Sequence, residues 1–247
     1  MPGTIQDLIK NQSVYTHLKP KKLKFDILPD LYLGIMSDEH FCHYGTDTLQ
    51  WVIKNSSEAH YKNYPDNITY NFNNRGFRDN SWPSDLQNNV WCVGDSHTMG
   101  IGVKEEDMFC NLIEHTHNLN VVNISFYAAN NIWLSCAAVD ILKEINPKYL
   151  VIGWTHFDKI IAPYEDTTDK IESLIFFRKC VDRVYKANKN TKIIHFIVPN
   201  STKHIIPDNS YENFFGIIES IDKARDSFHI GPKTHKMLAN KIGELLC

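Results

Sequence analysis

From about Asn89 onward, short apolar runs alternate with longer segments whose apolar residues recur at helical spacing. Short apolar runs are typical of buried strands, and strands are expected at 90–93, 120–124, 149–152 and 192–198. The helical patterns cover 105–114, 131–145, 169–187, 211–221 and 231–246. In the longest of them, the expected inner face consists of Ile171, Leu174, Ile175, Cys180, Val181 and Val184.

This alternation predicts the fold class. Strands joined by helical crossovers pair in parallel, so we expect an α/β protein: a three-layer α/β/α sandwich with a mainly parallel central sheet. Ligands bind beyond the carboxyl ends of the strands in such sheets, so chemistry is expected just after Val93, Ile124, Ile152 and Val198. Residues 1–88 are rich in Asn, Asp, Tyr and Pro, with a strand expected at 25–35. They are predicted to be an extension packed on a core of residues 89–247.

Composition narrows the function classes. The 247 residues are 43% hydrophobic, which is typical of a globular chain and excludes general disorder. A net charge of -3 without a basic stripe argues against nucleic acid as a partner. No apolar run reaches the ~20 residues that cross a bilayer, and the start resembles no signal peptide, so we expect no membrane partner and a cytoplasmic location.

The cysteines and histidines indicate no metal site or disulfide framework. The six cysteines are scattered and form no C-x-x-C pair, which favours buried free thiols. The twelve histidines include no H-E-x-x-H or similar ligand spacing. His195, inside a predicted strand, is expected to be a hydrogen-bonded core or edge residue. We therefore expect no metal and no organic cofactor.

The strongest local signal is Gly94-Asp95-Ser96-His97-Thr98, directly after the first predicted strand. A serine on a tight turn after a strand projects its hydroxyl above the sheet, where nearby backbone N–H groups can face an oxyanion. The G-x-S-x-G elbow is not met, because Thr98 occupies the last glycine position. Asp95 is expected to tie down the turn. In the alternative interpretation, Ser96 only caps the next helix.

A second signal is Asp226-Ser227-Phe228-His229, just before the last predicted helix. An aspartate three residues before a histidine can accept a hydrogen bond from the imidazole Nδ1–H, which leaves Nε2 free to take a proton from a serine. The pair means little alone. Together with Ser96, at a second loop–helix junction, it indicates a Ser-His-Asp hydrolytic site.

With these blocks the chain resembles the SGNH hydrolases, the GDSL-like esterases, lipases and deacylases, over roughly residues 74–246. The resemblance implies a flavodoxin-like fold, Ser96 as nucleophile and one oxyanion donor, His229 as base and Asp226 as its partner. Residues 74–78 are also similar to an N-x-G-F-R segment that precedes the nucleophile strand in many members.

Two blocks depart from the family pattern. Its second block has a glycine whose N–H enters the oxyanion hole, and the best match here is Ala128, which is expected to serve only if its φ is negative. Its third block is G-x-N-D, whereas this chain has Gly153-Trp154-Thr155-His156, with the Thr155 hydroxyl in place of the asparagine amide. The loss of one oxyanion donor typically costs ~10²–10³ in rate.

The expected function is hydrolysis of a small acyl ester, such as O-deacetylation of a carbohydrate, with an acyl ester or acylated glycan as partner. His97, Trp154 and His156 are expected to line the pocket, although a plain surface position is as compatible for His97. The long connections 154–169 and 199–211 are candidates for lids. The alternative is a non-catalytic glycan-binding or structural protein with a degraded oxyanion hole, and transfer to a sugar hydroxyl is a variant.

Overall fold

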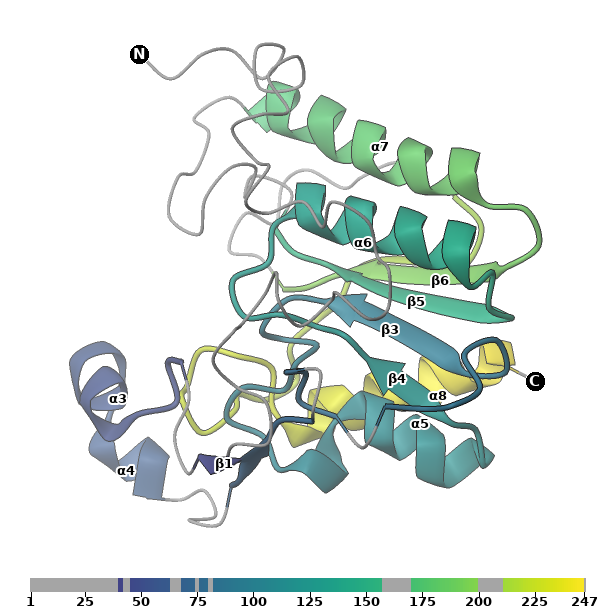
Figure 1. Ribbon diagram of the computed structural model, residues 1–247. Coiled ribbons are helices and arrows are strands. Elements are labelled where there is room, and N and C mark those ends of the chain that lie inside the picture. Colours follow the sequence, from purple (N-terminus) through teal and green to yellow (C-terminus); the bar gives the residue numbers. More distant parts are fainter. Residues whose placement is uncertain are drawn as a thin grey trace.

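A five-stranded parallel sheet forms the centre of the protein (Figure 1). The computed structural model describes residues 40–41, 45–62, 68–73, 76–79, 82–156, 170–199 and 211–246. The strands are β3 (Val90–Gly94), β4 (Val121–Asn123), β5 (Tyr149–Trp154), β6 (Lys192–Ile197) and β7 (Phe214–Ile217). Their order is β4-β3-β5-β6-β7, and every neighbouring pair is parallel. The order reverses at the β3/β5 junction, which is where ligands bind in open sheets of this kind.

Helices cover both faces of the sheet, as Figure 1 shows. On one face α5 (Phe109–His117) packs beside α8 (Pro232–Leu246), and on the other α6 (Asn131–Glu144) packs beside α7 (Lys170–Ala187). A short 3₁₀ turn, η2 (Glu105–Asp107), precedes α5. Each face has its own apolar cluster, and the strand residues between them are buried throughout β3, β4 and β5. The predicted three-layer α/β/α sandwich is confirmed.

The helix predicted at 211–221 is wrong, because this segment contains strand β7. Phe214 and Ile217 pair with β6, and the register shifts by one residue between them. Gly216 lies in this shift with a φ of 70°, a conformation that glycine adopts readily and that a helix excludes. A glycine inside a short apolar run was therefore the signal for a bulged edge strand.

The inner face of α7 also differs from the prediction. Phe176 and Phe177 are buried with Cys180, Val181 and Val184, whereas Ile175 is 48% exposed. A helix presents a continuous stripe at spacings of three and four residues, and from Cys180 and Val181 this stripe continues back to Phe176 and Phe177, not to Leu174 and Ile175. From residue 89 onward, the other predicted strands and helices agree with the structure to within a few residues.

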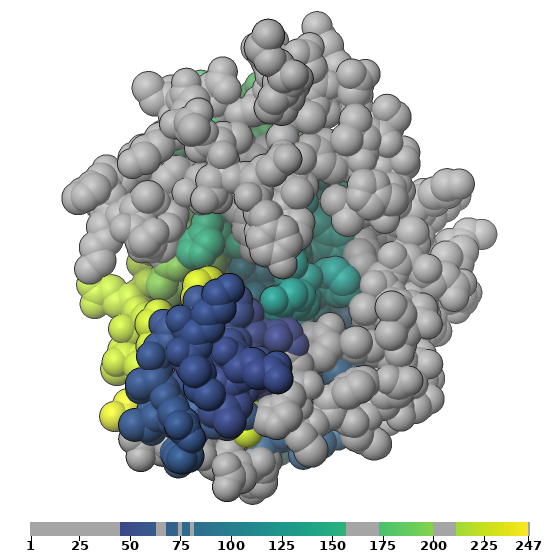
Figure 2. Space-filling view, turned by 90° about the vertical axis from the view of Figure 1, so that its left-hand side faces the viewer, coloured from purple at the N-terminus to yellow at the C-terminus, as the bar shows by residue number. Residues whose placement is uncertain are grey.

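The described part of the first 88 residues falls into two groups: residues 40–41, 45–62 and 68–73 lie at the edge at which the strands of the sheet end, and residues 82–88 lie beside the start of β3, where the Lys148 N–H donates to the Gln87 carbonyl (Figure 1). It contains α3 (Leu49–Asn55), α4 (Glu58–Lys62) and the two-stranded antiparallel pair β1 (His40–Phe41) and β2 (Tyr70–Asn71). Figure 2 looks onto this edge and shows residues 45–62 in front, beside the yellow C-terminal part. The strand predicted at 25–35 lies outside the described residues, and the boundary at residue 88 stays a prediction.

Four of the six cysteines fall within the described ranges: Cys92, Cys110, Cys136 and Cys180. All four are buried free thiols, as predicted. Among the helices that the structure describes, none is long and apolar enough to span a membrane.

Candidate active site

The serine turn begins where β3 ends and is seated on two glycines. Gly94 of β3 lies opposite Gly153 of β5, and the Thr98 side chain fills the space above both. A Cβ at Gly94 would lie 2.0 Å from the Thr98 Oγ1, and one at Gly153 would lie 2.3 Å from it. The threonine that breaks the G-x-S-x-G pattern, two residues after Ser96, therefore anchors the turn to the sheet.

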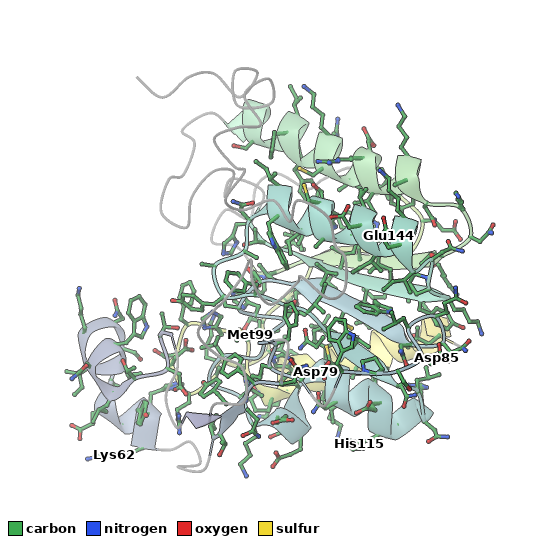
Figure 3. The ribbon with its side chains drawn as sticks, in the orientation of Figure 1. Lys62, Asp79, Asp85, Met99, His115 and Glu144 are labelled. Atoms are coloured by element: carbon green, nitrogen blue, oxygen red, sulfur yellow. The ribbon has the colours of Figure 1, made fainter. Side chains whose placement is uncertain are left out.

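Two further groups hold this turn in place. The Asp95 carboxylate accepts a hydrogen bond from the His97 N–H at 2.9 Å, so Asp95 ties down the turn as predicted. The buried Arg78 guanidinium donates to the carbonyl oxygens of Met99, Gly100 and Val103. In Figure 3 Met99 lies beyond the end of β3, toward α3. Arg78, part of the N-x-G-F-R resemblance, thus holds the loop that leads away from the serine.

The acid–base turn is organised by the Asp226 carboxylate. Its Oδ1 accepts the backbone N–H groups of Phe228 and His229, each at 3.0 Å. Ser227 adopts a φ of 57°, which lets the chain turn sharply between the two ends of the motif. The D-x-x-H segment therefore forms a turn that is capped by its own aspartate, and this turn places the His229 imidazole next to the Asp226 carboxylate.

Helix α8 starts directly after this turn, and its first N–H groups are capped from a distance. The Asp222 carboxylate accepts from the N–H groups of Lys233 and Thr234, each at 3.0 Å. An antiparallel bridge between Lys223 and Ile230 closes the base of the loop. The turn is thereby held at both ends, and the negative charge lies favourably at a helix N-terminus.

The structure brings the three predicted residues Ser96, His229 and Asp226 together in one hydrogen-bonded row. The Ser96 Oγ lies 2.7 Å from His229 Nε2, and His229 Nδ1 lies 2.6 Å from Asp226 Oδ2. Burial raises the pKa of Asp226, but the charge and hydrogen bonds of His229, together with the Thr46 hydroxyl, bring that pKa down to about 2. The carboxylate is therefore ionised at neutral pH and can hold the imidazole Nδ1–H.

Ala128 lies in a tight turn after β4. The Ala129 N–H donates to the Phe126 carbonyl at 3.2 Å, and Ala128 occupies the third position of that turn with a φ of 62°. The condition that the sequence set for the donor role, a negative φ, is not met. A left-handed conformation costs an alanine ~1–2 kcal/mol, so the position keeps the backbone that a glycine would adopt and carries the strain of a side chain.

Thr155 follows β5 at the register of the serine. Gly94 and Gly153 are paired, so Ser96 and Thr155 each lie two residues beyond the same point of the sheet. Thr155 is fully buried, and within the described part of the chain its Oγ1 has no hydrogen-bond partner. The amide of Asn131, the first residue of α6, donates to the carbonyl oxygens of Thr155 at 3.4 Å and His156 at 3.1 Å. Sequence reasoning missed this asparagine.

Aromatic rings surround the imidazole of His229. The His97 ring lies 4.6 Å away and the Phe228 ring 5.0 Å away, centroid to centroid, and His156 lies 6.3 Å from His97. Phe228 is 50% exposed. The structure thus brings His97 and His156 to the neighbourhood of the serine, and it adds Phe228, an exposed apolar residue inside the acid–base motif that we did not single out.

Trp154 does not belong to this neighbourhood, which corrects the prediction for it. It is fully buried, its indole N–H donates to His195 Nδ1 at 3.0 Å, and its ring packs edge-on against Phe177. Successive side chains of a strand point to opposite faces, and Trp154 is on the face covered by α7. His195 is a hydrogen-bonded core residue as expected, and burial lowers its pKa to about 3.

Most of the predicted lids, 157–169 and 200–210, lie outside the described residues. Among the described side chains, no group of three or more His, Cys, Asp or Glu residues could hold a metal ion.

Comparisons with known proteins add a likeness of fold. No family model matches this chain, and no curated protein does. Similar solved structures include a family two carbohydrate esterase from Clostridium thermocellum, crystallised with cellohexaose (12% identity, TM-score 0.46, 67% of this chain and 65% of that one). Another is a putative lipolytic protein of the G-D-S-L family from Desulfitobacterium hafniense (16% identity, TM-score 0.42, 64% of this chain and 99% of that one).

Both descriptions belong to the GDSL-like esterases and lipases, the class whose sequence blocks this chain resembles. The chain spans slightly less than two thirds of the length of the carbohydrate esterase. With TM-scores below 0.5, neither likeness carries an argument about activity.

Proposed function

We propose that the protein is a serine ester hydrolase that removes a small acyl group, with acetylated carbohydrate as the leading substrate class. The observation that carries the proposal is the hydrogen-bonded row of Ser96, His229 and Asp226, with contacts of 2.7 Å and 2.6 Å. These lie within the reach that a nucleophile and its base need, with a third group orienting the base. The non-catalytic alternative rested on a degraded oxyanion hole, which the row does not address, so the experiment below separates the two.

In the proposed mechanism, His229 Nε2 takes the proton of Ser96 while Oγ attacks the ester carbonyl. The ionised Asp226 holds the Nδ1–H tautomer and stabilises the imidazolium that forms. The imidazolium then protonates the departing alcohol, and an acyl-enzyme remains on Ser96. Water attacks this ester with His229 as base, which releases the acid and restores the serine.

The proposed oxyanion donors are the N–H groups of Ser96 and Ala128 and the hydroxyl of Thr155. The support for Thr155 is its fully buried Oγ1, which lacks a hydrogen-bond partner among the described residues and stands at the register of the serine. A buried hydroxyl without a partner is costly, so a bound oxyanion would satisfy it. The hydroxyl therefore takes the role that an asparagine amide has in the family pattern.

The surroundings of the serine favour a small polar ester. His97 and His156 place two imidazole rings near the serine, and the half-exposed ring of Phe228 offers one apolar face against which a sugar ring can lie. Acetylated sugars are therefore the first substrates to assay.

Ser96→Ala tests the proposal. The wild type should react with a fluorophosphonate probe and hydrolyse p-nitrophenyl acetate and an acetylated oligosaccharide, while Ser96→Ala should do neither and should melt at the same temperature. The matched control is Ser125→Ala, which removes a buried hydroxyl after β4 and should remain labelled. Equal turnover by wild type and Ser96→Ala, or an unlabelled wild type, would refute the proposal.

A further inference from the structure

The acid–base turn is held from outside by three residues of the N-terminal region: Thr46, Asp47 and His60, here called the clamp. The His60 Nε2 lies 3.0 Å from the Ala224 carbonyl oxygen. Asp47 accepts two hydrogen bonds from Arg225, at 2.8 and 2.6 Å, and both side chains are almost fully buried.

The next contact of the clamp reaches the carboxylate of the proposed site itself. The Thr46 hydroxyl donates to Asp226 Oδ2 at 2.5 Å, and it lies 3.4 Å from His229 Nδ1. The same oxygen of Asp226 is therefore in hydrogen-bond contact with both the His229 imidazole and the Thr46 hydroxyl. Three consecutive residues, 224 to 226, are each contacted by a different clamp residue.

The clamp also reaches the loop that follows Ser96. Tyr70 donates its hydroxyl hydrogen to Asp47 at 2.6 Å and accepts from the Gly102 N–H at 2.7 Å. The Gly102 carbonyl in turn accepts the Arg225 N–H at 3.0 Å. Gly102 has a φ of 73°, and a Cβ there would lie only 3.0 Å from the Arg225 N, so glycine permits this close approach. One continuous network thus joins the serine loop to the acid–base turn.

We propose that Thr46 is a positioning residue of the reaction: its hydroxyl holds the Asp226 carboxylate in the orientation that aligns His229 with Ser96. This inference rests on the proposed function and extends it, because it makes the N-terminal region part of the active site. A carboxylate on a sharp turn can rotate about its own bond, and the backbone N–H groups of the turn hold only Oδ1. Thr46 restrains Oδ2, the oxygen that contacts the imidazole.

Thr46→Val removes the hydroxyl and keeps the shape of the side chain. The loss of a hydrogen bond to a charged group changes a rate or an equilibrium constant by about tenfold or more. We therefore expect kcat to fall about tenfold while KM stays within about twofold. Thr46→Ser restores the hydroxyl and should recover most of kcat. Thr48→Val is the matched control: Thr48 caps α3 through the Trp51 N–H, and the same substitution there loosens the region without touching Asp226.

The measurements are kcat and KM on p-nitrophenyl acetate, the melting temperature, and the proton resonance of the His229 Nδ1–H, which requires no turnover. Support consists of a loss of kcat and a shifted resonance in Thr46→Val only. Wild-type kcat in Thr46→Val, or an equal loss in Thr48→Val, overturns the inference while Ser96→Ala still upholds the proposed function. If the wild type hydrolyses nothing, the proposed function fails, and an unshifted resonance in Thr46→Val then overturns this inference separately.

Discussion

Replacement of Ala128 by glycine tests whether the turn after β4 is strained. Its φ of 62° costs an alanine about 1–2 kcal/mol, which glycine avoids. Against this, glycine loses about 0.4–1 kcal/mol through the greater freedom of the unfolded chain. The half-buried methyl group contributes a further few tenths of a kcal/mol. Ala128→Gly should therefore stabilise the protein by about 0.5 kcal/mol.

For a chain of this size, about 0.5 kcal/mol raises the melting temperature by about 1–2 °C. Ala129→Gly is the matched control, because Ala129 is buried and is not among the described residues with positive φ. It loses the methyl burial and the chain entropy without relief of strain, so it should destabilise by about 1–2 kcal/mol. Turnover of Ala128→Gly should persist, since the N–H remains.

Differential scanning calorimetry of the three proteins decides the matter. Opposite signs for the two glycine variants support a strained turn that preserves the backbone of the family's glycine. If Ala128→Gly melts as far below the wild type as Ala129→Gly does, then Ala128 is unstrained and the assignment of this turn to the oxyanion site loses its support.

Two further predictions concern charge. Asp226→Asn should lower kcat by about 10³–10⁴-fold, because an amide no longer enforces the Nδ1–H tautomer. Asp85→Asn, at an exposed position before β3, is the control, and a wild-type kcat in Asp226→Asn would contradict the mechanism. Stability should fall as the pH drops from 6.5 toward 3. Burial lowers the pKa of His195 and His235 to about 3, so on acidification these histidines take up protons in the unfolded chain before they do so in the folded protein. Each should lower the free energy of unfolding by about 3 kcal/mol at pH 4. Asp226, whose pKa of about 2 lies below the ordinary 3.8, adds a loss below pH 3.8. Urea midpoints measured against pH should show this slope, reduced in His195→Gln, and a flat profile between pH 6.5 and 4.5 would refute it.

Local patterns were enough to predict the sheet and the three residues of the row. Buried parallel strands are largely apolar, and four of the five were predicted from short apolar segments that alternate with helical patterns. Ser96 and the D-x-x-H pair were found because each belongs to a short turn whose geometry is set by neighbours in sequence. The rule that parallel strands place their carboxyl ends at one edge then joined the two turns.

Predictions failed where two structures share one pattern. Phe214 to Ile218 suits a helix or a strand, and only pairing beside β6, with Gly216 in the bulge, decides between them. Trp154 is the last residue of β5, the strand that pairs with β3, yet the pleat directs its side chain into the core toward His195. The sign of φ at Ala128 cannot be predicted from the residue type, because the turn that imposes it starts at Phe126, whose N–H donates to the Gly94 carbonyl of β3.

The amino-acid sequence by itself determined the alternating layers and the chemical groups of the row, since both depend on contacts between near neighbours. Only the tertiary structure decided that Thr46 meets Asp226 across 180 positions and that Asp47 pairs with Arg225 across 178. No periodicity marks such residues, because they contact a loop instead of a regular face. The closing of the chain onto the edge of the sheet is what brings the N-terminal region into the site.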